Sequence, residues 1–277
     1  MEAIKALSLG KIALGGKSVA LVAPNGSGKT SNCIAPAILY FLTCFPRGQV
    51  PVTSSSWMQV EKQLFPSLRR YMDNPFFAGW TFNKTEIRTP EGGFAVGFST
   101  DNAGRAEGWH PKISPDVDPV FYVLDEAKTI PDSIFTAVSR CTLFHAFITS
   151  SPGADSGTFY DCFHKNSSLY YKIRVKYEDC PHIEINDPGK AERLKKEYGE
   201  QSSFYRSAIL GEFTDLDGQS VISRRALMEL VNNPPPFLDT GETCGGFDFA
   251  AGAMKTSLRR GKAIVFSSPT TGPTRTP

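Results

Sequence analysis

Short apolar runs alternate along the first 150 residues with longer segments that have helical spacing. The runs predicted to be strands are 18–22, 50–53, 95–98, 120–124 and 143–148. The segments predicted to be helices are 31–44, 57–72 and 133–140. Pro36 is expected to kink the first or to lie in its first turns, and Pro66 to interrupt the second. The run 120–124 is wholly apolar, as expected for a central parallel strand covered on both faces. This alternation predicts an α/β fold: a mainly parallel sheet flanked by helices.

The pattern changes after about residue 215. We therefore predict a first domain at 1–215 and a linker at 216–240, which contains three consecutive prolines. A new strand pattern begins with GGFDFA and predicts the start of a second domain at 241–266. The last stretch, 267–277, is rich in Ser, Thr, Pro and Gly and is predicted to be disordered.

Composition and charge exclude several classes of protein. A formal net charge of +2 over 277 residues gives no global polycation, so any nucleic-acid contact must come from a local patch. None of the six cysteines forms a CxxC pair or a zinc-type spacing, which predicts free thiols in a reducing cytosol. The sequence shows no signal peptide and no apolar run of membrane-spanning length. We therefore predict a cytoplasmic protein without membrane contact.

The segment APNGSGKT follows the first predicted strand and precedes the first predicted helix. Its candidate ATP-binding residues are Ala23, Pro24, Asn25, Gly26, Ser27, Gly28, Lys29 and Thr30. The two glycines allow positive φ, so that backbone amides point at phosphate oxygens, and the helix N-terminus adds a favourable field. Lys29 would meet the β- and γ-phosphates, and Thr30 would bind Mg²⁺. The alternative is a glycine-rich turn that matches the pattern by chance.

A second motif, VFYVLDE, ends an apolar strand in two carboxylates. The carboxyl end of a strand is where α/β sheets place their ligands. Asp125 would hold the magnesium ion, and Glu126 would activate the attacking water as general base. The alternative is an acidic residue that only caps the next helix.

A third motif, ITSSPG, places small hydroxyl residues at the end of another predicted strand. Thr149, Ser150 or Ser151 would then sense the γ-phosphate or position water. Taken alone, Ser-Pro-Gly indicates only a turn.

These motifs, taken in order, resemble the large terminase subunit of tailed bacteriophages, the motor that packages DNA into proheads. The stretches that carry the resemblance are VAPNGSGKT, VTSSSWMQVEKQLFPSL, GRAEGWHP, FYVLDEA, ITSSPGADSGTFYDCF, YRSAILGEF and GGFDFAAG. The resemblance implies a P-loop NTPase fold of the RecA/ASCE-like type, with ATP and Mg²⁺ as cofactors. It also implies that Lys29 and Glu126 are catalytic, that Asp125 binds metal, and that Thr149, Ser150 and Ser151 couple hydrolysis to movement.

The resemblance also suggests an arginine that reaches the γ-phosphate of a neighbouring subunit in a ring. Arg105, in GRAEGWHP, is the candidate for this catalytic role, followed by Arg69 and Arg70. The alternative, a solvated surface arginine, has equal weight. Gln59 lies where DNA-translocating ATPases often couple or touch substrate, although a solvent-facing position is the favoured prediction. His110 is assigned no role.

The sequence departs from the family pattern at both ends. Only 22 residues precede Ala23, and none is a glutamine of the kind that reads adenine in the family. GGFDFAAG resembles the first strand of an RNase H-like nuclease and puts Asp248 at a metal position. Two-metal cleavage needs several carboxylates, but no Asp or Glu follows Asp248. We therefore predict an incomplete nuclease domain without activity in this chain.

The leading hypothesis is an ATP-hydrolysing motor that moves double-stranded DNA, with a portal protein and a small terminase subunit as implied partners in the cytoplasm of a bacterial host. The basic segments 172–176 and 193–196 are candidate contacts to DNA phosphates, although each is more often a solvated face. Two alternatives stay open: another P-loop DNA translocase or helicase-like ATPase, and an inactive remnant. A common helicase needs a second RecA-like domain, for which the chain has no room.

Overall fold

The computed structural model describes residues 17–99, 103–214 and 230–233. By its internal contacts the chain divides into two units, Met1–Val221 and Ile222–Pro277, and the fold below belongs to the first. The predicted linker, nuclease strands and tail lie outside the described residues, apart from 230–233, and remain predictions. No helix among the described residues has the length and apolar character needed to cross a bilayer.

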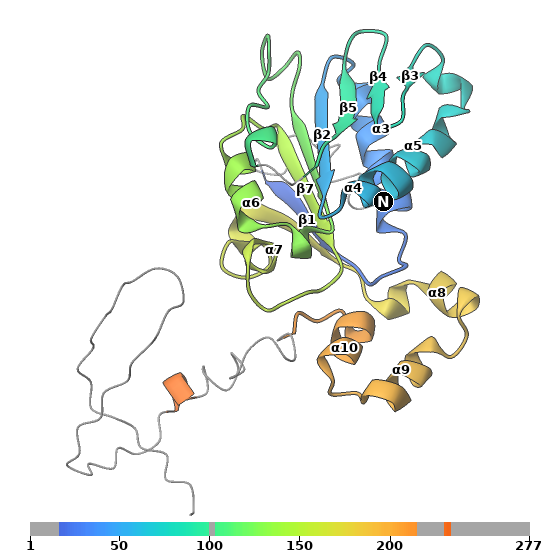
Figure 1. Ribbon diagram of the computed structural model, residues 1–277, viewed down its shortest axis with the longest axis vertical. Coiled ribbons are helices and arrows are strands. Elements are labelled where there is room, and N and C mark those ends of the chain that lie inside the picture. Colours follow the sequence, from blue (N-terminus) through green and yellow to red (C-terminus); the bar gives the residue numbers. More distant parts are fainter. Residues whose placement is uncertain (1–16, 100–102, 215–229, 234–277) are drawn as a thin grey trace, which may run out of the picture. The chain divides into compact units, whose positions relative to one another are not determined.

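The described part of the chain contains one sheet with the strand order β3-β4-β5-β2-β6-β7-β1-β8 (Figure 1). The strands are β1 (Ser18–Val22), β2 (Gln49–Ser54), β3 (Thr81–Phe82), β4 (Glu86–Arg88), β5 (Phe94–Gly97), β6 (Phe121–Asp125), β7 (His145–Ser150) and β8 (Tyr170–Arg174). Neighbours from β5 to β8 are parallel, and only the β3–β4 and β4–β5 pairs are antiparallel. The predicted α/β fold with a mainly parallel sheet is confirmed.

Helices cover both faces of this sheet, with α3 and α5 on one face and α6 and α7 on the other (Figure 1). The helices are α3 (Ala35–Cys44), α4 (Trp57–Gln59), α5 (Phe65–Met72), α6 (Asp132–Ser139), α7 (Thr158–Asp161), α8 (Pro181–Asn186), α9 (Lys190–Tyr198) and α10 (Ser203–Tyr205). Alternate strand residues divide between the two layers: Val19 and Leu21 face α3, whereas Ala20 and Val22 face α6. Each face of the sheet packs against its own hydrophobic cluster. The central strands are therefore continuous apolar runs in the sequence.

Pro36 and Pro66 each lie in the first turn of an α-helix that directly continues a π-helical segment. Lys29–Ile34 precedes α3 and Val60–Leu64 precedes α5, and both are π-helical. The residue before each proline donates to the carbonyl five positions earlier, Ala35 to Thr30 and Phe65 to Val60. The wider turn accommodates the proline, which has no N–H to donate. Pro66 therefore does not interrupt the helical segment 57–72.

Two strand boundaries differ from the sequence prediction in a way that affects the site. β6 extends to Asp125, and β7 runs two residues further than predicted, through Ser150. Thr149 and Ser150 thus belong to the strand, and only Ser151 follows it. Short hydroxyl side chains paired along a buried strand do not have the apolar signature on which the prediction relied.

Candidate nucleotide site

The loop after β1 has the backbone of a phosphate cradle. Gly26 and Gly28 have φ of 82° and 78°. A Cβ added to Gly28 would lie 2.5 Å from the Asn32 side-chain nitrogen, so a larger residue here would also displace the Asn32 side chain. The loop is attached to the sheet, because the Ala23 N–H donates to the Ser150 carbonyl at 3.1 Å. Ser27 Oγ is buried and has no hydrogen-bond partner among the described residues, as expected of a group that awaits a ligand.

A contact that the sequence did not predict supports the same loop. His182, on α8, lies with Nε2 3.0 Å from the Gly26 carbonyl oxygen. Because a carbonyl only accepts, Nε2 carries the proton in this contact. The helical segment after β8 therefore contacts the phosphate loop, 156 residues away in sequence. No sequence signal marked His182, because a lone histidine in a short helix has no pattern.

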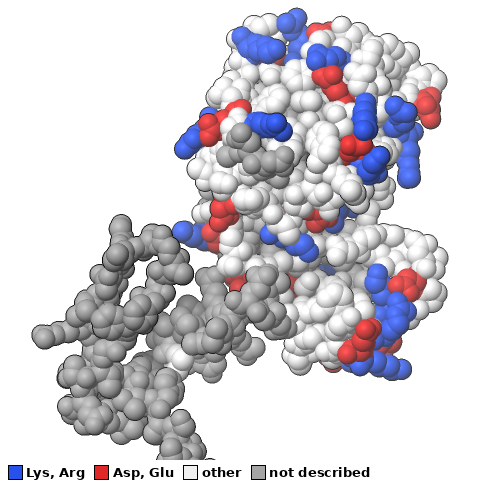
Figure 2. All heavy atoms as spheres, viewed as in Figure 1, with Lys and Arg blue, Asp and Glu red and all other residues white. Residues whose placement is uncertain are grey.

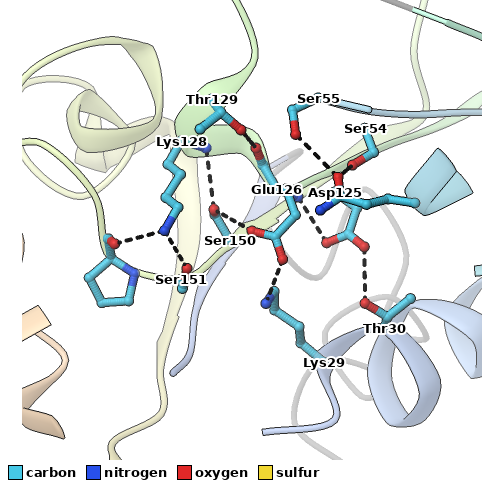
Figure 3. A network of polar contacts seen from close by, with 12 residues as sticks. Lys29, Thr30, Ser54, Ser55, Asp125, Glu126, Lys128, Thr129, Ser150 and Ser151 are labelled. Carbon is cyan, nitrogen blue, oxygen red and sulfur yellow. Dashed lines mark hydrogen bonds and ion pairs between the residues drawn. The ribbon is translucent and has the colours of Figure 1, made fainter. Parts of the chain in front are cut away.

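The polar ends of three neighbouring strands meet at one edge of the sheet (Figure 3). Lys29 and Thr30 come after β1, Asp125 ends β6 and Glu126 follows it, and Ser150 ends β7, which lies between β1 and β6. Lys29 Nζ lies 2.8 Å from Glu126 Oε1, and Thr30 Oγ1 donates to Asp125 Oδ2 at 3.0 Å. The structure thus brings together the candidate phosphate, metal and general-base residues from separate motifs.

Asp125 is the most perturbed carboxylate at this edge. Its pKa is raised to about 6, first by burial and then by the adjacent Glu126 charge. Lys29 and the Thr30 hydroxyl act in the opposite direction without cancelling the rise. Only 5% of the Asp125 surface is exposed, and its neighbours do not fully compensate the negative charge of the carboxylate. A divalent cation would supply that charge.

Glu126 has an unusual backbone conformation. Its φ of 51° and ψ of 43° are left-handed, and no other non-glycine residue among those described has a positive φ. Such a conformation costs on the order of 1 kcal/mol outside glycine and is concentrated at functional sites. It lets the Glu126 N–H donate to Asp125 Oδ1 at 2.9 Å, while the side chain reaches Lys29 and Ser150.

The three candidate coupling residues are all buried, but only two of them contact the site. Ser150 Oγ donates to Glu126 Oε2 at 3.3 Å, and Ser151 Oγ accepts from Lys128 Nζ at 2.8 Å. Thr149 Oγ1 is buried without a hydrogen-bond partner among the described residues. Lys128 was not among the residues predicted from the sequence, although it lies two positions after Glu126, the candidate general base.

Gln59 differs from the favoured sequence prediction. It is half-buried rather than solvent-facing, and its Oε1 accepts from Ser54 Oγ at 2.8 Å and from Ser55 Oγ at 3.2 Å. Ser54 pairs in register with Asp125. Gln59 therefore connects the helical segment 57–72 to the edge of the sheet where Asp125 lies.

The candidate arginines are on the surface. Arg105 is exposed at the end of the turn Ala103–Arg105, and no ion pair with another described residue holds it. Arg69 and Arg70 end α5, and the Arg69 guanidinium stacks 4.5 Å from the centre of the Phe82 ring. No described contact brings any of the three to the phosphate loop. His110, also exposed, lies with Nδ1 2.9 Å from Thr142 Oγ1 in a contact between loops.

The two basic segments have structural partners of their own. Lys172 and Arg174 are exposed on the edge strand β8, where charged side chains discourage pairing with another chain. Around α9, Arg193 pairs with Asp187 and Lys195 pairs with Glu200. Figure 2 shows blue and red atoms side by side in this region. Neither segment forms an unbroken positive surface. Asp248 lies outside the described residues.

Comparisons with known proteins bear on the fold. No protein-family model and no curated protein matches the chain. Among solved structures, the large terminase of a thermophilic bacteriophage in complex with ATP-gamma-S has a TM-score of 0.55 and 14% identity over 77% of this chain and 52% of that chain. The ATPase domain of the large terminase of Thermus phage P74-26 has a TM-score of 0.52 and 16% identity over 71% of this chain and 88% of that domain. The fold is that of a large-terminase ATPase domain.

The resemblance inferred from the motifs is thereby confirmed at the level of fold. This chain spans about half the length of the first of these large terminases, with 49% of that chain matched in its complex with ADP. The matched P74-26 structure is an ATPase domain alone, and it is covered almost throughout.

Proposed function

We propose that this chain binds ATP with magnesium, hydrolyses it, and uses the energy to move double-stranded DNA in a packaging motor of the terminase type. The observation that carries the proposal is the convergence of Lys29, Thr30, Asp125, Glu126 and Ser150 at one edge of the sheet. These residues come from three separate motifs, the phosphate loop after β1, the acidic end of β6 and the hydroxyl residues of β7. The large terminase of the thermophilic bacteriophage, which has this fold, has been solved with ADP and with ATP-gamma-S.

The residues at this edge fit a magnesium ion. The Thr30 hydroxyl and the Asp125 carboxylate are hard oxygen donors whose oxygens lie 3.0 Å apart. No group of three His, Cys, Asp or Glu that could hold a metal exists in the described chain. Magnesium bound with a nucleotide needs no such group, because phosphate oxygens and waters complete its coordination. When bound, the ion neutralises charge on the β- and γ-phosphates.

Lys29, Glu126 and Ser150 have different roles in hydrolysis. Lys29, paired with Glu126 in this structure, turns to the phosphate oxygens, which carry more negative charge than one carboxylate. Glu126 loses its ion-pair partner and accepts a proton from the attacking water. Ser150 Oγ, which donates to Glu126 Oε2, fixes the direction of that carboxylate. The ion pair between Lys29 and Glu126 therefore keeps the base occupied until nucleotide binds.

Arg105 acts in a neighbouring subunit. Its exposed position, without an ion pair among the described residues, suits an arginine that reaches another copy's γ-phosphate in a ring. Arg69 is less suitable because its guanidinium already stacks on Phe82. The ring forms when subunits dock on a portal protein, with the small terminase subunit as a further partner, in the cytoplasm of the bacterial host.

DNA contacts in this proposal are made to phosphates and do not depend on sequence. Beyond residue 215 we retain the linker at 216–240, the RNase H-like start at 241–266 with Asp248 at a metal position, and the tail at 267–277. Two-metal cleavage of DNA needs several carboxylates, of which Asp248 would be one.

The proposal is tested by ATP hydrolysis with double-stranded DNA, with single-stranded DNA and without DNA. We expect hydrolysis that depends on magnesium and that double-stranded DNA stimulates more than single-stranded DNA. Stimulation by single strands alone would favour a helicase-like translocase, and the absence of hydrolysis would favour an inactive remnant. A cut in plasmid DNA that depends on Mg²⁺ or Mn²⁺ and is lost in Asp248→Ala would assign a nuclease function to Asp248.

A further inference from the structure

Lys128 connects the catalytic turn to the loop after β7. It lies in the turn Ala127–Thr129, directly after Glu126. Its ammonium donates to Ser151 Oγ at 2.8 Å and to the Pro152 carbonyl oxygen at 3.4 Å (Figure 3). A single side chain thus bridges two loops that lie more than twenty residues apart in sequence.

The backbone of Lys128 makes a second connection to the same loop. Its N–H donates to Ser150 Oγ at 3.3 Å, and that hydroxyl donates to Glu126 Oε2 at 3.3 Å. Because the hydroxyl accepts from one side and donates to the other, its proton is directed at the catalytic carboxylate. The position of Lys128 therefore determines how Ser150 orients Glu126.

The aliphatic part of Lys128 also packs on the loop backbone. A Cβ added to Gly153 would lie 2.9 Å from Lys128 Cβ and 3.1 Å from Cδ, so the lysine side chain lies directly against this glycine. The Gly153 carbonyl accepts from the Thr214 N–H at 3.1 Å, and Ala154 forms a parallel bridge with Thr214. Thr214 precedes residue 215, where we predict that the first domain ends.

Lys128 is an exposed residue, but its ammonium lies in a part-buried contact with Ser151, close to the charges of the site. Burial lowers the pKa of its ammonium, Glu126 raises it, and Lys29 lowers it again. Two uncharged acceptors would be served equally well by an uncharged donor, so the hydrogen bonds alone do not explain why a cation occupies this position. Lys29 forms an ion pair with Glu126, and Lys128 also interacts electrostatically with that carboxylate. When Lys29 turns from Glu126 to the phosphate oxygens, Lys128 remains as a positive charge near Glu126.

We propose that Lys128 is a positioning residue that holds Glu126 and the Ser151–Gly153 loop as one unit and transmits the state of the nucleotide site to Thr214. The proposal rests on the proposed ATPase function. In the free protein Glu126 has two cations nearby, and in the nucleotide-bound protein it has one. A shift of Glu126 toward Lys128 would move Ser151, Pro152 and Gly153, and with them the strand bridge at Thr214.

The test compares Lys128→Met, Lys128→Arg and the control Lys165→Met in the full chain. Methionine keeps the apolar stem of the lysine but removes its donor and its charge. Lys165 is exposed and makes no hydrogen bond or ion pair among the described residues. We expect Lys128→Met to lower kcat for ATP about tenfold with KM changed less than about twofold. Lys128→Arg should restore at least about half of kcat, and the control should match the unmodified protein.

The outcomes separate this proposal from a purely structural role. If Lys128→Met keeps the kcat of the control, the proposal is wrong. It is also wrong if Lys128→Arg is as impaired as Lys128→Met, since the charge would then not matter.

Hydrogen exchange at the Thr214 amide gives a readout that needs no turnover. ATP-gamma-S with Mg²⁺ should change the exchange rate of this amide in the unmodified protein and in Lys165→Met, but not in Lys128→Met. If the unmodified protein does not hydrolyse ATP, the proposed function fails and this measurement alone decides about Lys128. An equal change in all three proteins, or in none, overturns the proposal.

Discussion

The buried charge of Asp125 predicts that a neutral substitution stabilises the protein without nucleotide. Asp125→Asn keeps the size of the side chain and removes its charge. The asparagine oxygen can still accept from the Glu126 N–H, and its NH₂ can donate to the Thr30 hydroxyl, which then acts as acceptor. The variant should therefore lose the cost of burying a carboxylate while keeping both hydrogen bonds.

The magnitude follows from the shift in pKa. The pKa of Asp125 rises from 3.8 to about 6 on folding. The folded protein therefore holds this proton more tightly than the unfolded chain, and the stabilising contribution is full below pH 3.8 and is lost as pH rises through about 6. Two units at about 1.4 kcal/mol each give about 3 kcal/mol. Asp125→Asn should be more stable than the unmodified protein by about 3 kcal/mol at pH 8 and by only about 1 kcal/mol at pH 4.5.

The assay is urea unfolding at both pH values in EDTA and without nucleotide, followed by tryptophan fluorescence. Trp57, Trp80 and Trp109 are the only tryptophans of the chain, and all lie in the described domain, so the signal reports this domain. Asp116→Asn is the matched control, because Asp116 is exposed and makes no hydrogen bond or ion pair among the described residues. A loss of stability in Asp125→Asn at pH 8, or a difference that does not grow with pH, would show that burying the Asp125 charge does not destabilise the protein.

Three further predictions concern the loop, the strand and the ring. Gly28→Ala should weaken ATP binding at least about tenfold in a titration, because φ is 78° and the new Cβ would meet Asn32; Gly92→Ala, with φ of 96° in open space, should leave affinity unchanged. Thr149→Val removes a buried hydroxyl without a partner, so unfolding free energy should not fall, whereas hydrolysis stimulated by DNA should; a stability loss beyond about 1 kcal/mol would show that the hydroxyl is bonded. Arg105→Ala should bind ATP normally but hydrolyse it slowly, and mixing with Lys29→Ala protein should restore activity if Arg105 acts between subunits; no restoration would argue for a role within one subunit.

The strands and helices around the phosphate loop could be predicted from the sequence because their patterns have a direct physical cause. A strand such as β6 is buried on both faces and must be apolar along its length. The missed elements lack such a cause. β3 and β4 have two and three residues, and β8 alternates charged and core-facing residues at the sheet edge, so KIRVK was interpreted only as a basic segment.

The residues of the site were predictable where a motif fixes them next to one another in sequence. Lys29, Thr30, Asp125 and Glu126 follow strands whose carboxyl ends meet at one edge, so topology alone brings them close. The contacts of Lys128, His182 and Gln59 depend on how loops fold back after the strands. The left-handed backbone of Glu126, which directs the chain toward Lys128, has no signature in the sequence.

The central claim is that Lys29, Asp125 and Glu126 form one site that hydrolyses ATP. The most direct measurement is phosphate release by the full chain with magnesium and ATP, for the unmodified protein, Lys29→Ala and Glu126→Gln, together with ATP binding by each. We predict that Glu126→Gln binds ATP at least as tightly as the unmodified protein, since Lys29 is freed from its ion pair, but hydrolyses it at least about 100-fold more slowly. Lys29→Ala should neither bind ATP tightly nor hydrolyse it. Phosphate release that is equal in all three proteins would contradict the account.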